Sequence, residues 1–250
     1  MGVTSSFQHW DPDPISVVSG KGAYLTDVDG RKLLDLSMGF GAMLVGHLHP
    51  KIIKRVKKAL RSTGTLFVTP SPDATDVAER FKARFGLDML RFTNSGTEST
   101  MYAIRTARAV KQKNGVIKIE GGYHGGYDPM QVSVKPDLKD ISSPANPTAH
   151  VQPAVEADDV HVVPYNNLAR LEEIMKDHGH NIACFMIEPV IENLSIILPD
   201  AGYVQSVRDL GDEYGICLIF DEVKTGLTAG VAGAAARLGV KPDLITLAKS

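Results

Sequence analysis

The sequence has few cysteines, a single tryptophan and no dominant sign of charge. Two cysteines in 250 residues cannot form the disulfide framework of a small secreted domain. Since both lie inside apolar runs, we expect buried thiols in a reducing compartment. The formal net charge of −2 argues against a nucleic-acid or membrane surface. No apolar run is long enough to span a bilayer and no signal peptide is evident, so we expect cytoplasmic localisation.

Strand-like apolar runs and helical stretches alternate along most of the chain. This alternation predicts an α/β fold, with a mostly parallel sheet and helices on both faces. At 43% hydrophobic residues the chain can bury a substantial core. We expect an N-terminal segment with a β-hairpin at residues 1–50 and a large domain at residues 51–250.

The N-terminal part carries its own local signals. The Asp29-Gly30 pair predicts the turn of a hairpin between strands at 23–27 and 32–36. Apolar spacing predicts helices at about 50–62 and 73–85, the first of them amphipathic with a solvated basic face.

Two apolar runs that each end in a charged residue are the most informative feature. Residues 215–220 lead into Asp221, and residues 242–248 lead into Lys249. Contiguous apolar residues are typical of strands buried on both faces, and ligands of parallel sheets lie outside the carboxyl ends of such strands. Pyridoxal phosphate (PLP) uses these two groups, a lysine for a Schiff base and a carboxylate for its pyridinium nitrogen. Alternatively, each is a solvated loop charge.

The segment 94–98 reads Asn-Ser-Gly-Thr-Glu and follows a strand-like run at 89–93. It places a turn at a helix N-terminus, where free N–H groups and the helix dipole favour a phosphate. Gly96 lets the backbone approach the anion, and Thr97 adds a hydroxyl donor. A capping box starting at Ser95 explains the same residues without a ligand, and both readings can hold together.

Two more segments follow predicted strands. In the glycine-rich segment 121–126, the Tyr123 ring could lie flat on a planar cofactor, and His124 could act as a hydrogen-bonding group or as an acid or base. Glycine-rich loops are also common as plain turns. Glu188 ends another apolar run, and we expect it to face the same crevice as Asn193. The His47-x-His49 and His178-x-His180 pairs lack carboxylate or cysteine partners nearby, so we expect no metal site.

In order and spacing these segments closely resemble the class III aminotransferases, which are PLP enzymes of fold type I. The resemblance runs from about Gly22 to the last residue. The matching segments are Asn94-Ser95-Gly96-Thr97-Glu98, Tyr123-His124-Gly125, Glu188-Pro189-Val190, Phe220-Asp221-Glu222-Val223-x-Thr225-Gly226 and Pro242-Asp243-Leu244-x-Thr246-Leu247-x-Lys249. Within the family the chain is most similar to the glutamate-1-semialdehyde aminomutases, through stretches that include Gly46-His47-x-His49-Pro50 and Pro164-Tyr165-Asn166.

The resemblance implies a fold type I large domain, PLP as cofactor, and Lys249 and Asp221 as catalytic residues. Lys249 would hold the cofactor and move a proton, while Asp221 would keep the pyridine nitrogen protonated. Gly96 and Thr97 would bind the phosphate, and Tyr123 would stack on the ring. The implied cofactor-binding residues are Ser95, Gly96, Thr97, Tyr123, His124, Glu188, Asn193, Asp221, Val223 and Lys249. Val223 would pack on the second ring face, Asn193 would lie near the phenolic oxygen, and Glu188 would support Asp221 or His124.

The chain departs from the aminomutase pattern at Met38. A tryptophan that lines the substrate pocket typically follows the serine equivalent to Ser37. The segment 136–159, which resembles a mobile gating loop, also diverges. Family members continue beyond the lysine, so we expect residues 1–250 to be part of a longer homodimeric enzyme and to be poorly soluble or inactive alone.

The resemblance implies PLP-dependent transfer of an amino group on a small amino or oxo substrate. Several activities stay open: an aminomutase, a β-amino-acid or ω-amino transaminase, or an amino-acid epimerase. A catalytically incomplete α/β binding module is the non-enzymatic alternative.

Overall fold

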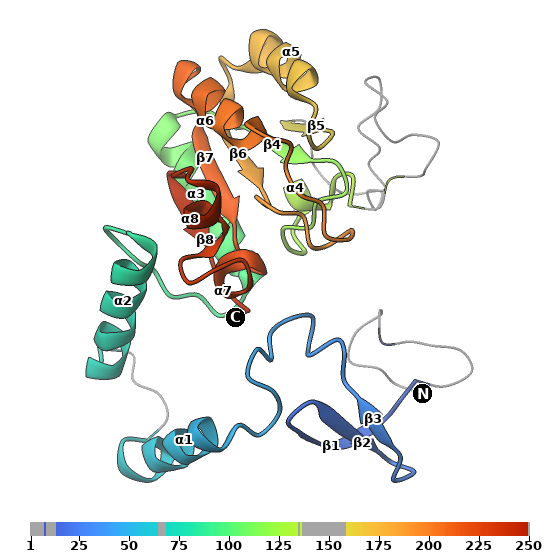
Figure 1. Cartoon of the computed structure of the whole chain (residues 1–250). Coiled ribbons are helices and arrows are strands. Elements are labelled where there is room, and N and C mark those ends of the chain that lie inside the picture. The colour runs from blue at the N-terminus through green and yellow to red at the C-terminus, as the bar shows by residue number, and fades with distance from the viewer. Residues whose placement is uncertain (1–7, 9–13, 65–68, 135, 137–158, 250) are drawn as a thin grey trace. The chain divides into compact units, whose positions relative to one another are not determined.

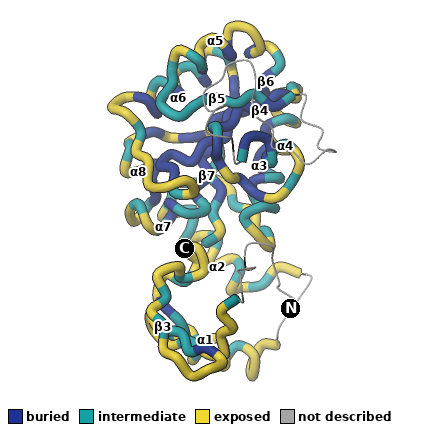
Figure 2. The backbone as a smooth tube through the Cα atoms, turned by 90° about the vertical axis from the view of Figure 1, so that its right-hand side faces the viewer, coloured by how far each residue is buried: buried dark blue, intermediate teal, exposed yellow. Residues whose placement is uncertain are grey.

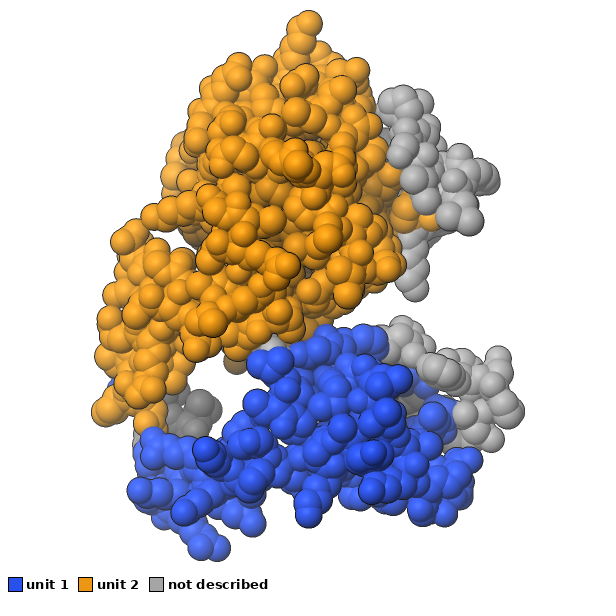
Figure 3. Space-filling model, viewed as in Figure 1, with its two compact units in different colours: residues 1–71 blue, residues 72–250 orange. Residues whose placement is uncertain are grey.

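The computed structural model describes residues 8, 14–64, 69–134, 136 and 159–249. The chain divides into two compact units, residues 1–71 and residues 72–250, which Figure 3 colours separately. A compact unit is not the same as a domain, so the predicted boundary after residue 50 stays a prediction. Nearly all of the predicted gating loop at 136–159 lies outside the described residues.

Unit 1 contains an antiparallel three-stranded sheet and a helix. The strands are β1 (Val17–Lys21), β2 (Tyr24–Asp27) and β3 (Lys32–Leu34), in that order in the sheet, and the helix is α1 (Pro50–Ser62). The predicted hairpin is therefore confirmed, and so is the predicted helix. The Asp27 carboxylate fixes the turn by accepting from the N–H of Asp29 at 3.0 Å and of Arg31 at 2.8 Å. The sequence reading missed β1.

Unit 2 is built on a five-stranded sheet in which every neighbouring pair is parallel. In spatial order its strands are β5 (Val160–Val163), β4 (Gly115–Ile119), β6 (Ile182–Ile187), β7 (Cys217–Asp221) and β8 (Leu244–Thr246). All residues of β4, β6 and β7 are buried (Figure 2). The predicted α/β fold with a mostly parallel sheet is confirmed.

Helices cover both faces of this sheet (Figure 1). Among them, α3 (Gly96–Lys111), α5 (Leu168–His178) and α6 (Tyr203–Glu213) pack on the strands. The other helices of unit 2 are α2 (Pro72–Phe85), α4 (Asp128–Gln131), α7 (Thr225–Thr228) and α8 (Gly233–Leu238). Alternate residues of β6 enter separate cores: Phe185 and Ile187 join the one containing α5 and α6 residues, and Cys184 and Met186 join the one containing α3 residues. A strand that serves two cores must be apolar throughout, which explains its contiguous run.

The predicted state of the cysteines is confirmed, whereas one predicted strand is absent. Both cysteines are free and buried, as predicted, and burial raises the pKa of the Cys217 thiol to about 11. The strand expected at 89–93 is wrong: the segment has no regular structure, and Met89 and Phe92 are exposed. An apolar run becomes a strand only where its backbone groups find a partner, and no described strand pairs with this one.

Candidate active site

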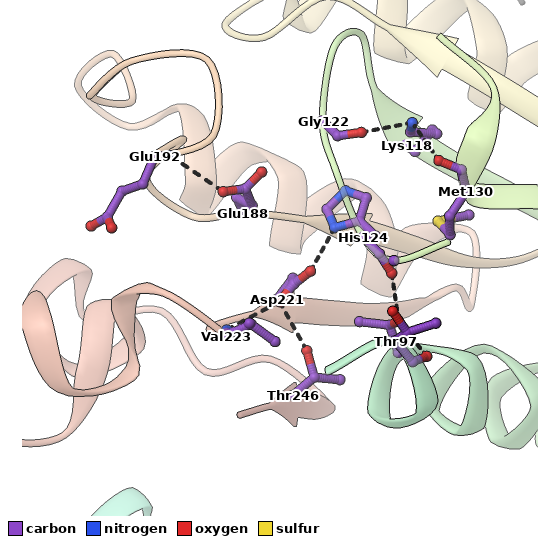
Figure 4. Close-up of polar contacts among 12 residues, drawn as sticks. Thr97, Lys118, Gly122, His124, Met130, Glu188, Glu192, Asp221, Val223 and Thr246 are labelled. Carbon is purple, nitrogen blue, oxygen red and sulfur yellow. Dashed lines mark hydrogen bonds and ion pairs between the residues drawn. The ribbon is translucent and has the colours of Figure 1, made fainter. Parts of the chain in front are cut away.

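Asp221 lies at the carboxyl end of β7 and is 4% exposed. Its Oδ2 is 2.7 Å from Nδ1 of His124, which follows β4. Its Oδ1 accepts from the Val223 N–H at 3.1 Å and from the Thr246 hydroxyl of β8 at 3.2 Å (Figure 4). Groups from three strands therefore hold one buried carboxylate at the edge where parallel-sheet ligands bind.

Lys249 follows β8 and is half-buried. Its backbone N–H donates to the Val223 carbonyl at 3.3 Å, which places Lys249 beside the segment after Asp221. Burial lowers the pKa of the Lys249 ammonium, the Lys224 cation lowers it further, and the carboxylates of Asp221 and Glu188 oppose both effects. A lysine is nucleophilic only as the neutral amine, so this environment favours the reactive form.

The N-terminus of α3 faces the same edge. The Ser95 hydroxyl oxygen accepts from the Glu98 N–H at 3.1 Å, which is half of a capping box. The Glu98 carboxylate reaches the Asn94 N–H at 2.6 Å rather than that of Ser95. Helix geometry leaves the N–H groups of Gly96 and Thr97 without intrahelical acceptors, so these donors stay available to an anion.

Close packing joins this helix start to the strand ends. A Cβ on Gly96 would lie 3.2 Å from Val223 and 3.3 Å from Ala248, so only glycine fits here without a shift. Gly125 has φ of +112°, and a Cβ there would lie 2.8 Å from Cα of Thr97. The segment 121–126 thus meets the phosphate-binding candidates directly.

The remaining predicted residues differ in burial. Glu188 directly follows β6 and is 5% exposed, whereas Tyr123 is 44% exposed. Burial raises the pKa of the Glu188 carboxyl, and His124 partly offsets the rise. Asn193 is exposed. The structure thus gathers His124, Asp221 and Glu188, but no hydrogen bond between described residues joins Asn193 to them.

Two polar atoms at this edge are buried without partners among the described residues: Nε2 of His124 and Oε1 of Glu188. Buried polar atoms are nearly always satisfied, so orphaned ones commonly mark a site for a ligand or water. The sequence reading gave no role to Thr246, although a hydroxyl three residues before Lys249 was a visible signal. It also missed the contribution of Lys224 to the charge around Lys249.

One histidine of each His-x-His pair contacts another side chain. Nε2 of His47 lies 2.7 Å from the Asp35 carboxylate, and the His178 ring stacks on that of His161 with 4.4 Å between centroids. Within the described part of the chain, no three His, Cys, Asp or Glu side chains cluster as a metal site would require, and no helix is long and apolar enough to cross a membrane.

Comparison with known proteins assigns the family. Residues 6–250 match the class III aminotransferase family model. The chain belongs to this family. A glutamate-1-semialdehyde 2,1-aminomutase of Thermomicrobium roseum is 39% identical over 245 residues, which are 98% of this chain and 56% of that protein. The chain thus spans little more than half the length of this relative.

Solved structures agree on the fold. A transaminase with PLP bound has a TM-score of 0.90 and 30% identity, covering 99% of this chain and 57% of that one. An ω-transaminase from Sphaerobacter thermophilus has a TM-score of 0.91 and 32% identity, with the same coverage of 99% and 57%.

Proposed function

We propose that this chain binds PLP and carries the chemical centre of an enzyme that moves an amino group. The observation that carries the proposal is the Asp221 carboxylate, buried at a strand end and held by His124 and Thr246, with Lys249 on the next segment. Family membership and the PLP-bound transaminase support it. The residues fit the cofactor: they offer a carboxylate for its ring nitrogen, an amine for its aldehyde and free N–H groups for its phosphate.

Bound here, PLP would act as an electron sink when a substrate C–H bond breaks. The Asp221 carboxylate would stabilise positive charge on the ring nitrogen, and His124 would hold that carboxylate in place. Lys249 would hold the cofactor and then, as the neutral amine, take a proton from the substrate carbon and return it. The N–H groups of Gly96 and Thr97 would bind the phosphate.

Further cofactor contacts are part of the proposal. Tyr123 and Val223 would lie on opposite faces of the ring, Asn193 near the phenolic oxygen, and Ser95 beside the phosphate. Glu188 would support His124, in keeping with their electrostatic coupling.

The favoured reaction is aminomutase-like transfer within one small amino or oxo substrate, because the Thermomicrobium relative is named an aminomutase. Transamination is the second candidate, because the two solved structures are named transaminases and Met38 departs from the aminomutase pattern. An epimerase is the remaining family alternative. We further propose that these residues work within a longer homodimeric enzyme in the cytoplasm, in keeping with the buried free thiols.

A spectral titration tests the proposed function. The natural full-length gene product is mixed with PLP, and binding should shift the cofactor absorbance. Glutamate-1-semialdehyde alone, and then pairs of amino donors and oxo acceptors, are supplied to separate mutase from transaminase activity. Binding without turnover on any of these would favour the incomplete binding module. No PLP binding would contradict the proposal.

A further inference from the structure

Lys118, in the middle of β4, is 0% exposed although it carries an amine. Its Nζ donates to the backbone carbonyls of Gly122 at 2.8 Å and Met130 at 3.3 Å (Figure 4). It also donates to the carbonyl of Val132 at 2.5 Å. A buried ammonium is costly unless its donors are satisfied. As the ammonium, the group has three N–H donors for these three carbonyls, and as the neutral amine it has two.

These carbonyls belong to two segments, the loop 121–126 that carries His124 and the segment 130–133. Gly122 directly precedes Tyr123 and His124. Met130 and Val132 flank Gln131, whose side-chain amide donates to a carbonyl two residues beyond Tyr123, that of Gly125, at 2.8 Å. The Lys118 amine therefore joins the loop 121–126 to the segment 130–133.

Other hydrogen bonds hold the two ends of the loop. The Gly121 N–H donates to the Ser133 carbonyl at 2.6 Å. The His124 carbonyl accepts from the Thr100 hydroxyl at 2.6 Å. Between these two points, the Gly122 N–H donates to the Ile119 carbonyl at 3.0 Å and the Gly122 carbonyl accepts from Lys118, so the amine supplies one of the two hydrogen bonds on the residue two positions before His124.

We propose that Lys118 is a positioning residue, whose buried amine holds the loop 121–126 on the segment 130–133 and thereby fixes the His124 imidazole against Asp221. The proposal rests on the proposed function, because it assigns Lys118 to the same PLP site. Lys118 itself touches neither Asp221 nor Lys249 through any hydrogen bond between described residues. Its effect passes through the loop, and a catalytic role is not part of it.

A purely structural role for Lys118 predicts something different. Loss of a core group would loosen the sheet generally, whereas loss of a positioning group loosens one loop. Lys113 provides a matched control, because its Nζ also donates to backbone carbonyls, those of Gly179 at 3.0 Å and Tyr214 at 3.4 Å. It precedes β4, at the opposite edge of the sheet from His124.

Amide hydrogen exchange in the cofactor-free full-length protein tests the proposal without relying on activity. We expect Lys118→Met to speed exchange of residues 121–126 and 130–133 by about tenfold or more, as in a local opening. Peptides from β6 and β7 should keep the wild-type rates, and Lys113→Met should leave the loop unchanged. Equal protection of the loop in Lys118→Met, or the same loss across β6 and β7, would overturn the proposal.

Lys118→Gln is the second variant, because its amide keeps two N–H donors but not the reach of the lysine. It should show an intermediate exchange rate, and it decides the question if Lys118→Met does not fold. Failure of both variants to fold would make Lys118 a residue of the core and contradict positioning.

Cofactor titrations link the result to function. Lys118→Met should bind PLP at least about tenfold more weakly, whereas Lys113→Met should match the wild type. Wild-type affinity in Lys118→Met would overturn the proposal. If the wild type itself binds no PLP, the proposed function fails, while the exchange data still report whether Lys118 orders the loop.

Discussion

The two edges of the parallel sheet use charged residues in different ways. At the amino edge, Arg208 pairs with the carboxylates of Asp212 at 2.6 Å and Asp243 at 2.8 Å, both of which reach solvent. At the carboxyl edge, His124 and Asp221 form a pair of which both members are buried. Solvent-screened pairs add little stability, and buried ones cost desolvation. The carboxyl edge therefore keeps a costly arrangement, and the role proposed for Asp221 in catalysis would give a reason for it.

Two adjacent carboxylates, Asp221 and Glu222, are both buried but have different partners. Glu222 is 0% exposed, and it accepts from the Thr225 hydroxyl at 3.0 Å and from the N–H groups of Ala234 at 2.6 Å and Ala235 at 2.9 Å. It thus caps the start of α8, whereas Asp221 faces the candidate site. We therefore expect replacement of Asp221 to impair activity and replacement of Glu222 to impair stability.

We expect the largest effect from Asp221→Asn, and we expect it on turnover. The amide is nearly the same size, so the fold should persist, but it cannot hold a full positive charge on the cofactor ring. We expect the barrier to rise by about 3 kcal/mol, a loss of two to three orders of magnitude in kcat. Steady-state kinetics and a thermal melt measure both properties. Near-normal turnover would show that Asp221 is structural.

Glu222→Gln should have the opposite profile. Its amide nitrogen replaces one acceptor, so at least one N–H at the start of α8 is left buried and unpaired. We expect the free energy of unfolding to fall by about 2 kcal/mol, as measured by denaturant titration. The bound cofactor should keep its wild-type absorbance. Unchanged stability would remove the distinction between the two carboxylates.

The sequence predicted the positions of Asp221 and Lys249 better than the role of Lys118 beneath the loop 121–126. The apolar runs before Asp221 and Lys249 sufficed to place both residues at one edge, because parallel strands align their carboxyl ends. The burial of Lys118 could not be predicted in this way. The sequence does not distinguish a strand lysine whose amine faces water from one whose amine faces carbonyls. Two of the three carbonyls that accept from Lys118 belong to residues 130–133, which contact β4 only in the folded chain.

A smaller effect is expected on the pH dependence of stability. Burial lowers the pKa of Lys118 to about 7, and Glu188 opposes the change. Between about pH 7 and pH 10 the folded chain then holds the neutral amine while the unfolded chain stays protonated. Stability should therefore rise with pH, by up to about 1.4 kcal/mol per unit.

Denaturant titrations across this range, compared with Lys118→Met, measure that contribution. In Lys118→Met the free energy of unfolding should no longer show this rise with pH, and in Lys113→Met it should. Identical slopes in wild type and Lys118→Met would refute the assignment.

The smallest effect is expected from Lys224→Met. Removing this cation should raise the pKa of Lys249, because the Lys224 charge lowers it. The pH at which PLP attaches half-maximally should move upward, with little change in the limiting rate. Stopped-flow absorbance against pH gives both values, with Lys113→Met as the control. A downward shift would contradict the proposed charge interaction.

Locating the lysine that holds the cofactor tests the central claim most directly. The full-length protein is incubated with PLP, reduced with borohydride and digested, and the pyridoxyl group is mapped by mass spectrometry. The account predicts one labelled peptide, with the group on Lys249, and none in Lys249→Ala. A label on Lys118, Lys224 or another lysine, or no label at all, would contradict it.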